Sequence, residues 1–216
     1  MRSVTPYLIL ALVLGSLGGA ARGWAADPLS TVNCDRQEVS FGDLTADALC
    51  ADSGATIGLV AAVSFKPGTV AAGGATRDQI ASLLQTPEES WGVCKLTGDQ
   101  LRQSLERSLS RLPLPSLAFL QISGLTVTYD PSRPRDQRIT VLTCSSGPVK
   151  AEQSYEVVMP LSLCQGGSGY FQIFDKDAMI RRGTTGLADA INACLQAHPA
   201  RAYNGQGRLL ATTPPK

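Results

Sequence analysis

Short apolar runs and helix-spaced leucines alternate along the chain from about residue 40 to residue 197. Four runs rich in β-branched or large apolar residues predict strands. They are 56–64, 91–96, 138–144 and 155–160. A further segment, 117–129, alternates apolar and polar positions and is interrupted by Gly124. Because glycine inside a strand marks a bulge or a bend, we expect a kink there.

Polar residues that can cap a helix precede each stretch of leucines or alanines at helical spacing. These residues are Ser40, Thr76, Thr97 and either Thr184 or Thr185. Ser40 with Asp43, and Thr97 with Gln100, have the spacing of a capping box. Helices and strands interleave with several hairpin-like steps, which predicts a single α+β domain with a mixed sheet and helices packed on it.

Residues 1–25 have the pattern of a secretory signal peptide. Arg2 supplies the positive end, an apolar run of about a dozen residues follows, and Gly23 and Ala25 are small residues that allow cleavage after Ala25. A run of this length is too short to span a bilayer stably, so we expect no membrane anchor after cleavage. A retained anchor is the alternative.

The signal peptide predicts a periplasmic location, with a fully secreted form as the alternative. Behind it we expect a leader over 26–37, the folded domain over 38–198 and a flexible tail over 199–216.

Charge and cysteine content narrow the possible partners. The 216 residues carry 19 Lys and Arg against 18 Asp and Glu, a net charge of +1, so no nucleic-acid surface is expected. Six cysteines in an exported chain predict disulfides, with 15 possible pairings. They are Cys34, Cys50, Cys94, Cys144, Cys164 and Cys194. With a single histidine and no Cys-x-x-Cys pair, no metal or other cofactor is expected.

Four segments in order resemble one known family. They are Gly-Asp-Leu-Thr-Ala-Asp-Ala-Leu at 42–49, Leu-Thr-Gly-Asp-Gln-Leu at 96–101, Phe-Leu-Gln-Ile-Ser-Gly-Leu with Tyr-Asp within 119–130, and Gly-Gly-Ser-Gly-Tyr at 166–170. Their order and spacing resemble the C-terminal domain of 5′-nucleotidases of the metallophosphatase–nucleotidase type, over about residues 38 to 197. The resemblance implies a nucleoside-gripping domain. In that family a separate N-terminal domain holds two metals and performs the hydrolysis.

The resemblance also implies that this chain does not hydrolyse nucleotides alone. Two-metal chemistry needs several His, Asp and Asn ligands, and the only histidine here is His198. A separate metallophosphatase domain is therefore a possible partner, and a nucleotide, a nucleoside or another small molecule is a possible ligand.

The positions that match the family's nucleoside site have changed. Ser162 stands where the family carries one stacking Phe, Pro87 stands at the place of the second, and Ser168 replaces the Asp beside Gly166 and Gly167. Losing two stacked rings, at about 1–3 kcal/mol per base, weakens nucleoside binding by several orders of magnitude.

Other residues near these positions are candidates to replace the lost contacts. Lys66 takes the place of a phosphate-binding Arg, without its planar fork. Phe65, Trp91 and Tyr170 are aromatic neighbours that a ligand could stack on, although a core position is the simpler interpretation of Trp91.

Three other kinds of site have weaker sequence support. Ser168 lies in a near match to a Gly-x-Ser-x-Gly elbow, but Tyr170 replaces the last glycine, so a structural turn is the simpler interpretation. Cys164 with His198 could form a thiol dyad, though a disulfide fits better. The simplest interpretation of Asp175 and Asp177 is that they lie in a solvated loop.

Three hypotheses for function remain open. The preferred one is an exported, stand-alone, non-catalytic binding or accessory module related to nucleotide catabolism. The second is a nucleotide-recognition partner that supports 5′-nucleotidase hydrolysis in trans. The third is a disulfide-stapled structural or interaction domain whose pocket has closed.

Overall fold

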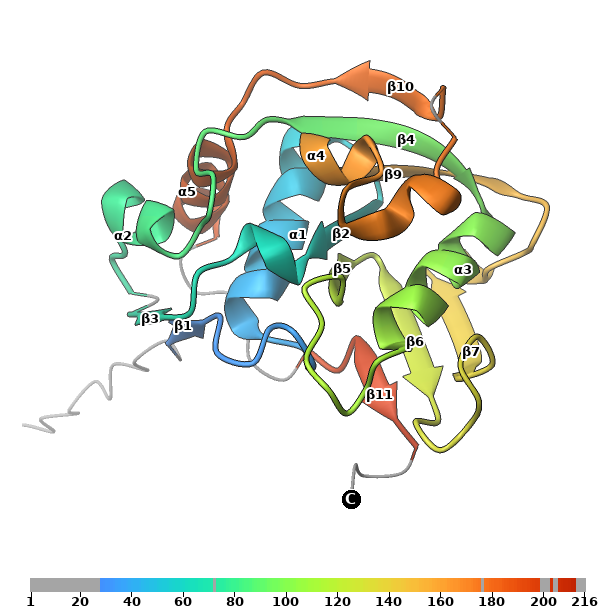
Figure 1. Cartoon of the computed structure of the whole chain (residues 1–216). Coiled ribbons are helices and arrows are strands. Elements are labelled where there is room, and N and C mark those ends of the chain that lie inside the picture. The colour runs from blue at the N-terminus through green and yellow to red at the C-terminus, as the bar shows by residue number, and fades with distance from the viewer. Residues whose placement is uncertain (1–27, 72, 176, 199–202, 204–205, 213–216) are drawn as a thin grey trace, which may run out of the picture.

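The computed structural model describes residues 28–71, 73–175, 177–198, 203 and 206–212. A five-stranded sheet lies at its centre (Figure 1), with strand order β10-β4-β9-β2-β5. The strands are β10 (Met179–Arg182), β4 (Trp91–Thr97), β9 (Ser154–Pro160), β2 (Ile57–Ala61) and β5 (Leu120–Ser123). β2 and β9 are parallel and the other neighbours are antiparallel, so the predicted mixed sheet and α+β class are confirmed.

Two smaller sheets and the helices surround this sheet. One sheet has the order β11-β6-β7-β8 and the other pairs β1 with β3. Their strands are β11 (Leu209–Ala211), β6 (Leu125–Tyr129), β7 (Ile139–Cys144), β8 (Gly147–Pro148), β1 (Leu29–Ser30) and β3 (Thr69–Val70). The helices are α1 (Ser40–Ser53), α2 (Arg77–Ser82), α3 (Gly98–Leu109), α4 (Leu161–Cys164) and α5 (Leu187–Ala197), with 3-10 turns η1 (Ala62–Ser64) and η2 (Gly167–Gln172).

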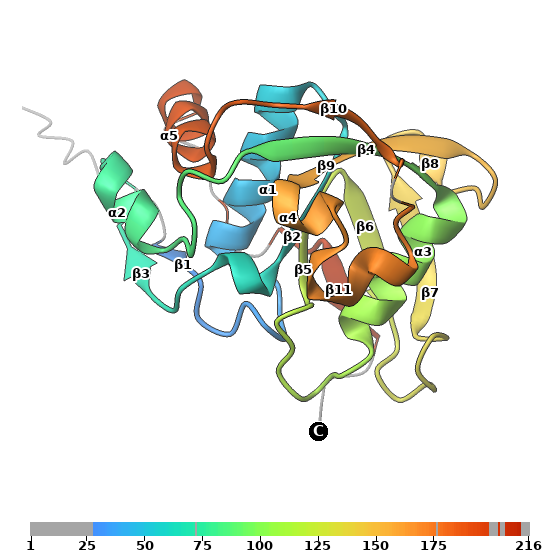
Figure 2. The same ribbon diagram turned by 45° about the horizontal axis from the view of Figure 1, so that its top comes forward.

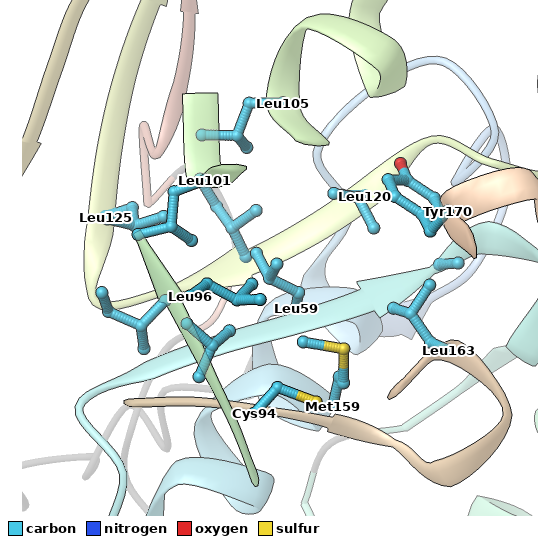
Figure 3. Close-up of a cluster of buried hydrophobic side chains, with 14 of the residues drawn as sticks. Leu59, Cys94, Leu96, Leu101, Leu105, Leu120, Leu125, Met159, Leu163 and Tyr170 are labelled. Carbon is cyan, nitrogen blue, oxygen red and sulfur yellow. The ribbon is translucent and has the colours of Figure 1, made fainter. Parts of the chain in front are cut away.

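Each face of the central sheet packs against its own core. Val60, Val93 and Val158 belong to a cluster shared with α1, α2 and α5. Their neighbours along the same strands, such as Leu59 and Met159, belong to a second cluster with α3, α4, η2 and the four-stranded sheet (Figure 3). Because side chains alternate between the faces of a strand, continuous apolar runs let one sheet serve both cores.

Gly124 joins the central sheet to the four-stranded sheet. Its φ of 73° is in the left-handed region, and a Cβ atom there would lie 1.8 Å from the carbonyl oxygen of Thr56. The kink expected in 117–129 is therefore a corner at which the chain leaves β5 and enters β6.

Two of the four predicted cap residues do cap their helices. Thr76 and Thr97 each form a complete capping box, with Gln79 and Gln100. Ser40 does not cap α1: the cap residue is Val39, and the Ser40 hydroxyl instead accepts from Ser30 N at 2.9 Å. The last helix begins after Gly186 rather than after a capping threonine.

Both ends of the described chain belong to the fold, unlike the leader and tail predicted from sequence. In the expected leader, Leu29 is 1% exposed and pairs with Val70 of β3. In the expected tail, β11 pairs in parallel with β6 (red and yellow-green in Figure 1), and Tyr203 is buried. The predicted signal peptide and the first two positions of the leader lie outside the described residues.

A buried ionic cluster attaches the C-terminal segment to α1. Arg208 donates through Nη2 to Asp47 at 2.9 Å and through Nη1 to the carbonyl oxygen of Ile122 at 2.6 Å. Glu38 Oε2 accepts from the backbone N–H groups of Arg208 and Leu209, both at 2.8 Å. These contacts explain why a three-residue strand stays in place.

We predict that Arg208→Ala destabilises the protein by about 3–5 kcal/mol, because it leaves buried carboxylates without their cation. Urea unfolding followed by circular dichroism measures the change. Arg135→Ala, at an exposed loop position, is the matched control and should have little effect. A loss below about 1 kcal/mol for Arg208→Ala would mean that the cluster does not hold the segment.

Candidate functional site

The glycine-rich turn after β9 is the centre of the predicted site. β9 leads into α4, and the chain then turns sharply through Gly166, Ser168 and Gly169, with φ values of 86°, 55° and 82°. A Cβ atom on Gly166 would lie 2.6 Å from Phe171 Cα, and one on Gly169 would lie 2.0 Å from the guanidinium of Arg107. These glycines therefore let the turn pack against protein atoms.

Four contacts fix the turn in place. A disulfide joins Cys164 at the end of α4 to Cys94 in β4. Arg107 Nη2 donates to the carbonyl oxygen of Ser168 at 2.7 Å, and its guanidinium lies 5.3 Å from the centre of the Tyr170 ring. The Tyr170 hydroxyl donates to the carbonyl oxygen of Ala118 at 2.7 Å, which ties η2 to the loop before β5 (Figure 2).

The segment 86–91 lies beside α4, so the structure brings Ser162 and the Pro87 region together. Leu161 N donates to the carbonyl oxygen of Ser90 at 2.9 Å, and Ser162 N donates to Glu89 Oε1 at 2.7 Å. Glu88 forms an ion pair with Arg77 at 2.7 Å. The places that the resemblance assigns to aromatic rings are thus bordered by two carboxylates.

The three aromatic candidates are all inside the protein. Trp91 is 6% exposed, with Nε1 donating to Asp52 at 2.6 Å and Arg181 over its ring. Phe65 packs edge-on against Phe41. Tyr170 is fully buried, and burial raises the pKa of its phenol. None of these rings offers a free face to a ligand in this conformation.

Lys66 is exposed, and its backbone N–H donates to Leu83 at the end of α2. Phe65 pairs with Leu84 after α2 and packs on Phe41 of α1, and the carbonyl oxygen of Lys66 accepts from the Thr31 hydroxyl at 2.6 Å. Ser162 and Gly167 instead contact each other. Which of the predicted residues touches a ligand stays a prediction.

One predicted disulfide is confirmed, and the other four cysteines are free thiols: Cys34, Cys50, Cys144 and Cys194. Burial raises the pKa of Cys34 and of Cys50 to about 11, so neither is a thiolate at neutral pH. Because Cys164 is bonded to Cys94, the alternative of a thiol dyad with His198 is wrong. Asp175 is exposed and accepts from Gln100 Nε2 at 3.3 Å, as a loop residue would.

Glu89 is a neighbour of Ser162 that sequence reasoning missed. Its only local signal is the Pro-Glu-Glu stretch before β4. The contact depends on α4 folding back toward β4, and residues 73 positions apart carry no local pattern for it.

One hollow on the described surface borders the turn, with Arg107 and Gln172 in its lining. This hollow and three others, of about 390–490 Å³, are lined by none of the predicted ligand residues. Within the described ranges, no group of three or more His, Cys, Asp or Glu side chains is arranged to hold a metal. None of the helices that the structure describes is long and apolar enough to cross a membrane.

The fold defines the class of domain first. A 5′-nucleotidase precursor from Thermus thermophilus superposes with a TM-score of 0.71 at 23% identity, over 85% of this chain and 38% of that chain. A putative 5′-nucleotidase from Staphylococcus aureus, solved with alpha-ketoglutarate, superposes with a TM-score of 0.69 at 16% identity, over 87% and 40%.

The sequence comparison then gives the family. Residues 18–176 match the 5′-nucleotidase, C-terminal domain, family, and the chain belongs to it. Human 5′-nucleotidase is 31% identical over 100 residues, 43% of this chain and 17% of the relative. Snake venom 5′-nucleotidase of Naja atra is 30% identical over 92 residues, 39% of this chain and 17% of the relative. The chain thus spans a small part of these relatives.

We predict that the double substitution Cys94→Ala with Cys164→Ala lowers the free energy of unfolding by about 2–4 kcal/mol, because the bond closes a long loop of the unfolded chain. Urea unfolding with and without reductant measures it. Reductant should lower the stability of the unsubstituted protein and leave the double variant unchanged. Cys144→Ser, at a free thiol, is the control. Equal stability of the oxidised protein and the double variant would contradict the prediction.

Proposed function

We propose that this chain is an exported, non-catalytic binding module that acts beside a metallophosphatase domain, without gripping the nucleoside itself. The observation that carries this proposal is the state of the two ring positions. Ser162 and Pro87 occupy them, Glu89 accepts from Ser162, and the aromatic side chains nearby are buried. Stacking, which supplies much of the affinity for a base, has no ring available there.

A protein partner suits the surface around the turn better than a nucleoside does. Leu117, Phe171 and Val63 are 62%, 67% and 40% exposed. Val63 N donates to the carbonyl oxygen of Leu117 at 3.0 Å, and η2 is tied to the same loop through Tyr170. Exposed apolar side chains gathered around a rigid turn favour a macromolecular contact.

The relatives support the kind of partner proposed. The solved nucleotidases are more than twice as long as the part that this chain covers, so the equivalent domain in them sits in a longer chain. Snake venom nucleotidases are among the relatives, which agrees with export. We place the module in the periplasm or outside the cell.

The first prediction from this proposal concerns small ligands. Millimolar AMP, adenosine or UDP-glucose should leave the thermal unfolding midpoint unchanged, whereas a ligand at 100 times its Kd would add about 2.7 kcal/mol of stability. A catalytic 5′-nucleotidase tested alongside serves as the positive control. A saturable rise with AMP or adenosine would instead favour nucleotide recognition in trans.

The second prediction concerns the partner. Leu117→Ser with Phe171→Ser should weaken binding to the catalytic part of a 5′-nucleotidase from the same organism by tenfold or more, since central apolar contacts contribute above about 1 kcal/mol each. Biolayer interferometry measures the Kd. Ile180→Ser, at an exposed apolar position of the edge strand β10, should leave it unchanged. Equal binding by the unsubstituted protein, the double variant and Ile180→Ser would contradict the partner role, and so would a lack of binding by the unsubstituted protein.

A further inference from the structure

Two carboxyl groups meet where α1 joins the C-terminal segment. Glu38 precedes α1, and the Asp43 side chain in the first turn of this helix is hydrogen-bonded to the Glu38 side chain. Yet no N–H or hydroxyl group of the described residues donates to Glu38 Oε1 or to either side-chain oxygen of Asp43, and all three atoms are buried. Carboxylate oxygens only accept hydrogen bonds, so a bond between these two groups requires a proton on one of them.

Arg208 does not remove the need for that proton. Its Nη2 atom donates to Asp47, and its Nη1 atom donates to the backbone carbonyl oxygens of Ile122 and Asp43. Its Nε atom lies 3.7 Å from Asp43 Oδ1, which is beyond hydrogen-bond distance. One guanidinium therefore serves the three carboxyl groups of Glu38, Asp43 and Asp47. Because like charges in contact inside a protein repel strongly, one of these groups stays neutral.

We propose that Glu38 and Asp43 share one proton and that this carboxyl–carboxylate pair is a pH-sensitive latch for the C-terminal segment. With the proton on Asp43, its hydroxyl donates to Glu38 Oε1 in the strong, charge-assisted bond that a carboxylic acid forms with a carboxylate. The other oxygen of Glu38, Oε2, accepts from the backbone N–H groups of Arg208 and Leu209, both at 2.8 Å. The proton thereby fixes the side chain that holds the start of β11.

The energetics of Asp43 agree with this geometry. Burial raises the pKa of Asp43 to about 9; Arg208 opposes the rise, and Glu38 and Asp47 add to it. The folded protein therefore keeps the proton at neutral pH, whereas the unfolded chain releases it above about pH 4. Between these two values the folded state holds one proton more, so each added pH unit lowers the folding equilibrium constant by about tenfold through this group.

The other groups around the pair keep their charge in this range. β1, β2 and β5, which also pack on α1, contain no ionisable residue. β9 and α5 carry Glu156 and Asp189, which form ion pairs with arginines at the surface. Cys50 and Tyr129 face the cluster, and burial raises the pKa of both, that of Cys50 to about 11. The change in charge that the cluster undergoes near pH 9 is therefore the ionisation of Asp43.

Loss of the proton acts on β11 through Glu38. Ionised Asp43 repels the Glu38 carboxylate that it contacts, and Glu38 is then drawn away from the backbone N–H groups that it holds. β11 is only three residues long and lies at the edge of its sheet, so it opens before the central sheet does. This latch is independent of the glycine-rich turn and of the partner proposed for it.

Two measurements on the full chain test the latch. Carbon-13 NMR of the Asp43 carboxyl group should show a titration midpoint near pH 9, and a midpoint below about pH 6 would overturn the proposal whatever any variant does. Hydrogen-exchange mass spectrometry then follows the opening. Between pH 7 and pH 10, the protection factor of segment 207–212 should fall by at least about tenfold more than that of β9. Equal losses in the two segments would mean that the pair does not act on β11.

Asp43→Asn separates the shared proton from general stability. The amide has the shape of a protonated carboxyl group and can donate to Glu38 Oε1, but it has no proton to lose in this range. The variant should therefore keep the protection of segment 207–212 up to pH 10. Asp78→Asn, at an exposed position of α2, should lose that protection as the unsubstituted protein does. A loss in Asp43→Asn equal to that of the unsubstituted protein would overturn the proposal.

Discussion

The pairing of β9 with strands on both sides is the constraint on which the rest of the structure depends. β9 runs parallel to β2 and antiparallel to β4, and Val157, Val158 and Met159 are each fully buried. Burying side chains of this size contributes about 1.5–3 kcal/mol each. Successive residues face opposite cores, so β9 fixes the two helical layers relative to each other and also directs the chain into α4 and the turn.

The glycine-rich turn is held by contacts within the protein. Its glycines still adopt left-handed conformations, but the space that they open is filled by Phe171 and Arg107. The disulfide to Cys94 and the hydrogen bond from Tyr170 hold the turn against β4 and the loop before β5. A turn fixed by covalent and buried contacts keeps its shape without a ligand, which suits a surface that presents side chains to a protein.

Local patterns predict the parts of the fold that depend on local interactions. The capping boxes at Thr76 and Thr97 form because all their partners lie within three residues. Ser40 and Asp43 have similar spacing, yet the Asp43 side chain faces the interior near Arg208, which is 165 positions away. β11 is likewise not predicted from the sequence, because its three residues carry no local pattern. Its position depends on distant residues, Glu38 and Asp47. The sequence favours a core position for Trp91, which the structure confirms. Local patterns do not predict the residues that cover it, Arg181 of β10 and Gly183 after that strand.

The three acidic residues of α1 differ in burial and in partners: Asp52 is exposed, whereas Asp47 and Asp43 are buried. Asp52, near the C-terminal end of the helix, accepts from Trp91 and so has a donor for its charge. Asp47 in the middle has Arg208 and the hydroxyl of Ser123 at 2.6 Å. Asp43, one turn earlier, is fully buried with Arg208 Nε 3.7 Å from its Oδ1, and burial, opposed by Arg208 and aided by Glu38, raises its pKa to about 9. The same helix therefore pairs one buried carboxylate with Arg208 and, one turn earlier, holds a neutral acid next to Glu38, because burial disfavours the ionised form.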